Sequence, residues 1–323
     1  ALLEEDARRA EAAALAVKGV SQCQSASAGY ARRMIHLAAT NGLSAGYMRS
    51  SRSISAVAVA GEGPGMERDL AAESRVYQSD LPGAESIGAL AGARAVERLG
   101  ARKPKTGAYP VLFDERVASG LIGHLLAAVN GQAIARGASW LRDCLGEQVL
   151  PAGLTITEDP HRPRISGSRP FDAEGLPTRV RNIVENGVLT GWTLDLGTAR
   201  KLGLRSTASA ARGPSAPPSP AHSNIALTEG PLTRDDLLRE MGTGLLVTAM
   251  LGASINPTTG DYSRGASGFW VEKGELAYPV NECTIAGNLR AMLMRITPAN
   301  DARPYLSHVV PSLLVEGLTL AGA

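Results

Sequence analysis

The chain has few of the residues on which several classes of function depend. Its three cysteines, Cys23, Cys144 and Cys283, are scattered over 323 residues. They form neither a CxxC pair nor a disulfide framework, which favours a reducing cytoplasm. Aromatic residues make up only 4% of the chain and the formal net charge is +2, so neither base-stacking platforms nor a basic nucleic-acid surface is expected. No apolar run reaches the ~20 residues that span a bilayer, and residues 4–6 are acidic, so we expect no signal peptide and no membrane contact.

What is present is typical of a globular α+β protein. Hydrophobic residues make up 44% and charged residues 20% of a chain long enough for one large or two medium domains. Strands and helices do not alternate regularly, which argues against a doubly wound sheet. Helical spacing of apolar residues predicts helices over Ala1–Val20, over a segment ending near Leu99 that Asp80 or Ser86 caps, and over Ala118–Ala133, Asp235–Met241 and Thr284–Ile296.

Strands are predicted where short apolar or alternating runs lie between turn residues. These runs are Ser51–Gly61, Tyr109–Phe113, Leu245–Leu251 and Ser312–Leu320. Two hairpins are expected, one joining Thr178–Glu185 to Val188–Leu196 through Asn186-Gly187, and one joining Phe269–Glu272 to Glu275–Val280 through Lys273-Gly274. The Ser-, Ala- and Pro-rich segment Ser206–Ser223 is interpreted as a mobile loop or extended tether.

The stretch from 251 to 293 is the most informative part of the sequence. Its middle, Asn256–Gly268, is rich in Gly, Pro, Asn, Ser and Thr, and this composition predicts a long loop. The loop carries one charge of each sign, Asp261 and Arg264. Two interpretations stay open: an internal salt bridge that braces the loop, or a surface presented to a peptide or a partner protein.

The same stretch, GDYSRGASGFWVEKGELAYPVNECTIAGNL, resembles the C-terminal signature of the TldD/TldE family, also called PmbA or "modulator of DNA gyrase" proteins. Matching blocks in the same order are ATNGLSAGYMRSS, MERDLAAESR, AVERLGARKPKTGAYPVLFDERVASGLI, FDAEGLPTRVRNIVENGVLTGW and SLLVEGLTLAG. The segment YSRGASGFW resembles the sequences of the TldE (PmbA) branch rather than those of the TldD branch.

The resemblance implies a fold and a domain division. The expected fold is a small α/β N-terminal domain, of which residues 1–105 are the remainder, followed by a C-terminal domain over 106–323 in which a curved antiparallel β-sheet surrounds a buried helix. Family members carry roughly a hundred further residues before this point, so we expect that the N-terminal domain is truncated here.

The resemblance also places a zinc-protease motif, HExxxH, on the buried helix of the TldD branch. Alignment through GQAIARGASWLRDCLGE puts Ile122 at the first His, Gly123 at the Glu and Ala127 at the second His. Zinc hydrolysis needs imidazole ligands, a carboxylate base and an open coordination position, and none of these three residues provides one. His124 is in register with neither His, and Tyr305–Ala323 lacks the Cys that supplies a further ligand in the TldD branch.

Other catalytic chemistry has little support in the residues. None of the five histidines, His36, His124, His161, His222 and His308, lies three to five residues from another His or a Cys. No GxSxG elbow is present in a strand–turn–helix setting.

Single candidate residues also have ordinary structural interpretations. Cys283 follows a predicted strand and is interpreted as a small buried apolar residue. Asp172 and Glu174 precede a strand in a turn, where carboxylates usually cap or stay solvated.

Taken with the resemblance, these observations predict a non-catalytic subunit of a TldD/TldE-type heterodimeric zinc metallopeptidase. The complex is expected to act on flexible peptides, in peptide maturation or antitoxin turnover, with zinc in a TldD-type HExxxH partner subunit and no cofactor in this chain. The residues expected to face the partner or an extended peptide are Asp261, Tyr262, Ser263 and Arg264. Two alternatives stay open: a stand-alone homodimeric peptide-binding protein, and a hydrolase whose site has no recognisable motif.

Overall fold

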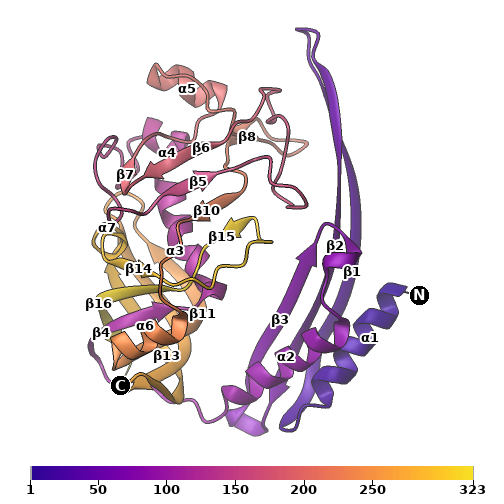
Figure 1. The fold of residues 1–323 in the computed structure, drawn as a ribbon, viewed down its shortest axis with the longest axis vertical. Coiled ribbons are helices and arrows are strands. Elements are labelled where there is room, and N and C mark those ends of the chain that lie inside the picture. Colours follow the sequence, from indigo (N-terminus) through magenta and orange to yellow (C-terminus); the bar gives the residue numbers. More distant parts are fainter. Residues whose placement is uncertain (1, 323) are drawn as a thin grey trace. The chain divides into compact units, whose positions relative to one another are not determined.

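The computed structural model describes residues 2–322, except for the side chain of Ala253, and divides them into two compact units (Figure 1). The first unit contains the residues up to 36, residues 46–102 and the short segment 164–166. The second contains residues 37–45, 103–163 and those from 167 onwards. Within residues 2–322, no helix is long and apolar enough to cross a membrane.

The first unit is a three-stranded sheet, in the order β1-β2-β3, packed against two helices. Its elements are α1 (Leu2–Leu15), β1 (Val20–Ala38), β2 (Ser44–Ala60), β3 (Glu67–Arg75), α2 (Ala84–Glu97) and two short 3-10 turns, Gly63–Gly65 and Gln78–Asp80. Alternate residues of β2, from Ile54 to Ala60, are buried against Ala10 and Ala14 of α1 and Ala91 and Ala95 of α2. These small side chains let the layers approach closely, and a Cβ at Gly88 of α2 would lie 2.0 Å from the carbonyl oxygen of Ala10.

The predictions for this unit are mostly confirmed. The strand expected over Ser51–Gly61 corresponds to the second half of β2, which ends at Ala60. The two expected helices are α1 and α2, but the helix predicted over Ala1–Val20 ends at Leu15 and Val20 begins β1; Ala1 lies outside the described residues. The predicted cap of α2 is wrong. Gly83 is its N-cap and makes no side-chain cap bond, because Asp80 pairs with Arg164 instead and Ser86 donates to the Gly83 carbonyl.

The second unit is built on a closed barrel. Five strands pair in the order β13-β12-β11-β4-β16, and β16 pairs again with β13 to close the ring. The strands are β4 (Gly107–Phe113), β11 (Gly244–Ile255), β12 (Asp261–Glu272), β13 (Glu275–Asn288) and β16 (Leu313–Ala321). All pairs are antiparallel except β4 with β11. The short strand β14 (Ile296–Pro298) pairs with the first half of β16.

A second sheet and five helices complete this unit. The sheet has the order β15-β10-β5-β6-β7, and a separate pair joins β8 to β9. Its strands are β5 (Ile156–Glu158), β6 (Arg181–Glu185), β7 (Val188–Leu189), β10 (Ile225–Leu227) and β15 (His308–Val309); the separate pair is β8 (Ala210–Ala211) and β9 (Ser219–Pro220). The helices are α3 (Glu115–Ala128), α4 (Gly131–Ala135), α5 (Leu196–Leu202), α6 (Arg234–Met241) and α7 (Leu289–Leu293).

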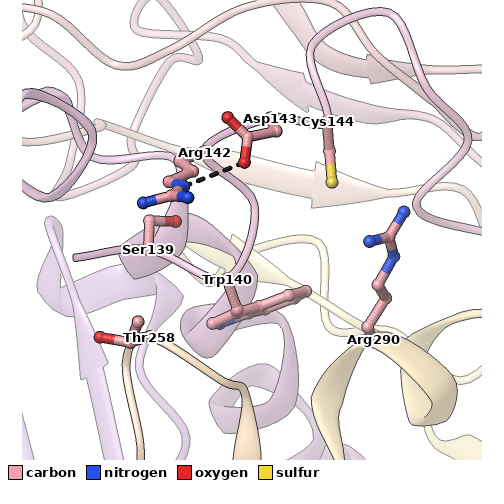
Figure 2. Close-up of a pocket in the computed structure, with 7 residues that line it drawn as sticks. All are labelled: Ser139, Trp140, Arg142, Asp143, Cys144, Thr258 and Arg290. Carbon is pink, nitrogen blue, oxygen red and sulfur yellow. Dashed lines mark hydrogen bonds and ion pairs between the residues drawn. The ribbon is translucent and has the colours of Figure 1, made fainter. Parts of the chain in front are cut away.

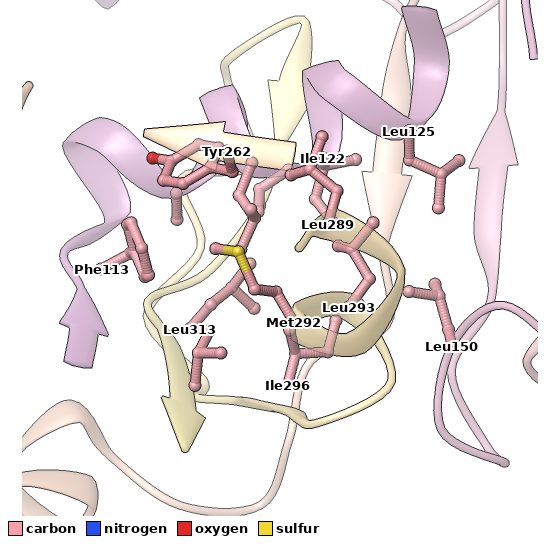
Figure 3. Close-up of a cluster of buried hydrophobic side chains, with 14 of the residues drawn as sticks. Phe113, Ile122, Leu125, Leu150, Tyr262, Leu289, Met292, Leu293, Ile296 and Leu313 are labelled. Atoms are coloured by element: carbon pink, nitrogen blue, oxygen red, sulfur yellow. The ribbon is translucent and has the colours of Figure 1, made fainter. Parts of the chain in front are cut away.

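The main core includes the buried side chains of α3, and Figure 3 shows part of it. Ile122 and Leu125 of α3 project into a cluster with Phe113 of β4, Tyr262 of β12 and Leu293 of α7. A second, smaller core covers the other face of the sheet, where α6 packs its buried Leu237 and Leu238 on residues of β4, β11 and β16. The expected mixed α+β fold, with a curved sheet around a buried helix, is therefore confirmed.

Both predicted hairpins are present, but the first is shorter than expected, because β6 begins at Arg181, β7 ends at Leu189 and Leu196 begins α5. The two turns have the same backbone conformation. Asn186 and Gly187 have φ of 49° and 82°, and Lys273 and Gly274 have φ of 54° and 81°. Two successive residues in the left-handed region form the type of turn that matches the twist of antiparallel strands, and glycine adopts this conformation without strain.

Four sequence predictions need correction. The long loop over Asn256–Gly268 is only a turn, because β12 begins at Asp261. The helix over Ala118–Ala133 ends at Ala128, where the Asn130 side chain starts a new helix by accepting from the Gln132 amide. The segment Thr284–Ile296 is first strand and then the single turn α7.

The fourth correction concerns Ser206–Ser223. This segment contains the β8–β9 pair rather than a plain tether. Ala208, Ser209 and Ala210 are buried, and the Asn130 amide donates to the carbonyl of Pro220.

Candidate functional site

The helix α3 is positioned by its first residues. Asp114 ends β4, and its backbone N–H donates to the Val247 carbonyl of β11. The Asp114 carboxylate then accepts from the Arg116 amide and caps the helix. This arrangement starts α3 at the end of two paired barrel strands, so the direction of the helix follows from the sheet.

The two sides of α3 differ sharply in composition. Leu121, Ile122, Leu125 and Leu126 are buried in the main core. On another side, Gly123 is half-buried and Ala127 is exposed. A Cβ at Gly123 would meet no atom within 4 Å, so a larger side chain has space at that position.

The residues present at these positions do not fit zinc. Ile122 is fully buried among apolar side chains, and neither Gly123 nor Ala127 carries a donor atom on its side chain. Among residues 2–322, no group of three or more His, Cys, Asp or Glu side chains is placed to hold a metal ion.

His124 is the ionisable side chain between the two aligned His positions of α3. Its ring lies edge-on to the ring of Tyr262, with centroids 5.8 Å apart and planes at 73°. Its Nε2 atom is buried and has no hydrogen-bond partner among the described residues. Burial, and next the positive charge of Arg264, lower the pKa of His124. The imidazole is therefore neutral near pH 7, packed as a core ring rather than arranged as a ligand.

The four residues predicted to face a partner or a peptide belong to β12, in the middle of the barrel wall. Tyr262 pairs with Ile255 on one side and with Gly287 on the other. Tyr262 is buried, and burial raises the pKa of its hydroxyl to about 12. It therefore belongs to the core and not to an exposed face of the chain.

The two charged residues of β12 bond to different neighbours instead of to each other: Asp261 to the turn before β12, and Arg264 to β11 where its pairing with β12 is irregular. The Asp261 carboxylate accepts from the Thr259 hydroxyl at 2.6 Å and from the Asn288 amide at 3.2 Å, and these bonds, that of Thr259 first, lower the pKa of Asp261. The Arg264 Nε donates to the Gly252 carbonyl at 2.7 Å. Ser263 lies between them and is half-buried.

A cavity of about 250 Å³ lies elsewhere in the second unit, and the sequence did not indicate it. Figure 2 shows the side chains that line it: Ser139, Trp140, Arg142, Asp143, Cys144, Thr258 and Arg290. The two guanidinium groups already have carboxylate partners, since Arg142 pairs with Asp143 at 2.9 Å and Arg290 with Glu147 at 3.0 Å. Burial raises the pKa of the Cys144 thiol. The cavity is thus balanced in charge, with an indole at one wall.

The structure also brings together two histidines that are far apart in the sequence. The rings of His222 and His308 have centroids 5.2 Å apart, because β10 and β15 are neighbours in the second sheet. Burial lowers the pKa of both. For His222 the pKa falls to about 4, with smaller lowering by His308 and by two arginines, Arg181 and Arg169, against a raising effect of Glu158.

The interpretation of Cys283 as a buried apolar residue is confirmed. Its thiol is buried and donates to the Ala266 carbonyl at 3.2 Å, and burial raises its pKa to about 11. The capping interpretation of Asp172 and Glu174 is also confirmed, because both carboxylates accept from backbone amides.

These features define a class of protein: a two-unit α+β protein whose second unit packs a closed five-stranded barrel and a second sheet on the largely buried helix α3. Solved proteins share this architecture. A protein from Bacteroides thetaiotaomicron described as a putative modulator of DNA gyrase superposes with a TM-score of 0.91 at 30% identity, over 99% of this chain and 71% of that one. The TldE structure from Thermococcus kodakarensis matches with a TM-score of 0.87 over 99% of this chain and 74% of that one, and at 22% identity it supports the fold alone.

The chain belongs to the PmbA/TldD family. The family model for the PmbA/TldA metallopeptidase C-terminal domain matches residues 106–322, and the model for the central domain matches residues 2–99. Metalloprotease PmbA of Escherichia coli O157:H7 is 42% identical over 284 residues, which cover 88% of this chain and 61% of that protein. The chain thus spans about three fifths of the length of this relative.

Proposed function

We propose that this chain is the non-catalytic subunit of a heterodimeric zinc metallopeptidase of the TldD/TldE type that acts on flexible peptides. The observation that carries the proposal is on α3. The family relatives are named metalloproteases, yet Ile122, Gly123 and Ala127 stand where the motif alignment requires two imidazoles and a carboxylate. In this proposal the zinc belongs to an HExxxH partner subunit.

In this proposal the chain holds an extended peptide at the free edges of its sheets and not at the closed ring of the barrel. Its ring of five strands is closed through β13 and β16, and a closed sheet offers no edge for strand addition. Edges are present at β14 and β15, whereas residues 146–149 bond to the backbone of β7 along its outer side. Strand addition at such an edge takes its affinity from backbone hydrogen bonds and so tolerates many peptide sequences.

The role of β12 follows from its contacts. Arg264 holds the Gly252 carbonyl through Nε, which leaves the outer fork of its guanidinium for a carboxylate, a group that arginine binds with two parallel bonds. Asp261 keeps the adjacent turn in place through Thr259 and Asn288. We propose that Arg264 contacts the partner or the peptide, while Asp261 and Tyr262 hold the strand that presents it.

The second candidate function is a homodimeric peptide-binding protein without peptidase activity, since the composition of α3 is compatible with it. Co-purification distinguishes the two. A tight one-to-one complex with an HExxxH protein supports the subunit proposal, whereas a stable homodimer that ignores such a protein supports the alternative. The cytoplasmic location expected from the scattered cysteines stays a prediction.

The decisive experiment measures zinc content and peptide hydrolysis for three samples: this chain, an HExxxH subunit of the family, and their mixture. We expect no zinc and no hydrolysis in this chain, with hydrolysis in the mixture that the other subunit lacks when alone. Stoichiometric zinc in the isolated chain would overturn the assignment of Ile122, Gly123 and Ala127. Chelator-insensitive hydrolysis by the isolated chain would instead identify it as a hydrolase with an unrecognised site.

A further inference from the structure

The long strand pair of the first unit presents a surface that the proposed function does not use. Strand β3 pairs with β2 only from Ala60 back to Arg52. Beyond that point, residues 28–36 of β1 and 46–51 of β2 form a two-stranded segment, here called the ribbon. Two strands by themselves are marginally stable in water, so a partner that buries part of the ribbon would stabilise it.

The ribbon exposes large apolar side chains of a kind that binding surfaces use. Tyr30 is 59% exposed, Met34 78% and Met48 55%. Tyr30 and Met34 lie on the same face of β1, because side chains alternate along a strand. The Arg32 guanidinium contacts the Met48 sulfur at 3.0 Å, which places a positive charge within this apolar surface. Methionine side chains are flexible and polarisable and adapt to different partners.

The charge of this region differs from that of the whole chain. From residue 12 to residue 61 the sequence contains no Asp or Glu. Within it, the buried Arg52 is paired with Asp6, whereas Arg32 and Arg33 are exposed on the ribbon. The ribbon is therefore locally positive, although the net charge of the whole chain is only +2. A second copy of the ribbon would place like charges opposite one another, which is destabilising.

The backbone of the ribbon is also available on one side. The sheet order is β1-β2-β3, so β1 is an edge strand of 19 residues. Along its outer side, alternate N–H and C=O groups have no strand partner among the described residues. Such an edge is a template for an extended segment of another chain.

We propose that the ribbon binds an extended acidic segment of another polypeptide, added as a strand along the outer edge of β1. Carboxylates of the segment pair with Arg32 and Arg33, and its apolar side chains pack on Tyr30, Met34 and Met48. A single-stranded nucleic acid fits less well, because it needs several aromatic platforms and Tyr30 is the one aromatic residue of the described ribbon that is mostly exposed.

The test uses the isolated chain and a fluorescent peptide that repeats Glu-Glu-Val-Val, about ten residues long, the length of a long strand. Because side chains alternate along a strand, each face of this peptide carries both Glu and Val, as pairing with Arg32 and Arg33 on opposite faces of β1 requires. Fluorescence anisotropy should show saturable binding that weakens as ionic strength rises. The double variant Arg32→Glu, Arg33→Glu should bind about tenfold more weakly, the effect of two exposed ion pairs lost and replaced by repulsion. The matched control is Arg205→Glu with Arg212→Glu, which makes the same change in charge at two positions of the second unit and should leave binding unchanged.

Two further peptides examine the mode of binding. An otherwise identical peptide with Pro at alternate positions lacks the backbone N–H groups of a ladder and should not bind, nor should a peptide that repeats Lys-Lys-Val-Val. Circular dichroism of the double variant must match that of the parent chain, which shows that the weaker binding is not caused by unfolding.

Three results would overturn the proposal. The first is equal binding of the Glu-Glu-Val-Val peptide by the parent chain and the double variant. The second is tighter binding of single-stranded oligothymidylate, lost in the double variant, which would assign the ribbon to nucleic acid. The third is a dimer in sedimentation that Met34→Ser dissociates, which would assign the ribbon to a second copy. None of these depends on an HExxxH subunit, so failure here is separate from failure of the proposed function.

Discussion

Replacing Asp172 with alanine should destabilise the second unit, and by more than the same change at the neighbouring Glu174. Its Oδ1 accepts from the amides of Glu174 and Leu176 at 2.9 Å each. Its Oδ2 accepts from the Ala210 amide at 3.0 Å. Asp172 is 2% exposed, so its carboxylate joins the turn before β6 to the segment that contains β8, out of reach of bulk water.

The size of the expected loss of stability depends on whether each amide that bonds to Asp172 has another hydrogen-bond partner in the variant. The amides of Glu174 and Leu176 belong to half-buried residues, and water can replace part of what they lose. The Ala210 amide belongs to a fully buried residue, and an unsatisfied buried donor costs about 1–3 kcal/mol. With the loss of two charge-assisted bonds beside it, we expect the free energy of unfolding to fall by about 3 kcal/mol.

Urea unfolding followed by tryptophan fluorescence measures this directly, because Trp140, Trp192 and Trp270 all lie in the second unit. The matched control is Glu174→Ala, which removes one bond, from the Leu196 amide at 2.8 Å, and should cost about 1 kcal/mol. If Asp172→Ala has the same urea midpoint of unfolding as the parent chain, the buried Ala210 amide does not cost stability when it loses this carboxylate, and the prediction is refuted.

Three other changes have clear expected outcomes. Gly268→Ala should prevent closure of the barrel and yield little soluble protein, since its Cβ would lie 1.9 Å from the Leu246 carbonyl oxygen; Gly123→Ala, with no atom in the way, should raise the midpoint of thermal unfolding through a gain of about 0.5–1 kcal/mol in helix propensity. His222 has a folded-state pKa of about 4, below its unfolded value of 6.5, so the unfolded state binds a proton more readily between these two pH values. The free energy of unfolding should therefore fall as pH drops from 6.5 towards 4, by at most about 3 kcal/mol. His222→Gln should flatten that part of a stability–pH curve measured by urea unfolding. Arg264→Ala should weaken assembly with the HExxxH subunit or peptide turnover by the complex while the isolated chain stays folded, and unchanged assembly together with unchanged turnover would remove this strand from the proposed contact surface.

The contrast between β2 and β12 shows where sequence patterns were informative. In β2 the alternation predicted the buried residues Ile54, Ala56, Ala58 and Ala60, with Ser55 and Val57 half-buried between them, so a local pattern was sufficient. In β12 the residues Gly265–Gly268 have the composition of a loop, and glycine is depleted in most strands. Here it is needed, because the neighbouring backbone of β11 lies so close to Gly268 that a side chain would collide with it.

The candidate site shows a similar division. The assignment of Ile122, Gly123 and Ala127 to the motif positions came from the sequence and stays a prediction, since it requires only an alignment and knowledge of what zinc binds. The neutral state of His124 was not, because it depends on burial beside Tyr262 and on the charge of Arg264, which lies 140 positions along the chain. The cavity beside Trp140 and the His222–His308 pair also join distant segments.

The sequence by itself determined the family, the α+β composition and the two glycine-containing hairpins. Each of these depends on residue type at one place or on spacing within one element, and such information is local. Only the tertiary structure decided that the polar stretch after residue 260 is a barrel strand, that Asp261 braces the turn before it and Arg264 the neighbouring strand β11, and that Arg32 and Arg33 lie on an edge strand beside exposed apolar side chains. The physical reason is that burial, strand pairing and charge neighbourhood are properties of segments brought together in space, and no single segment carries them.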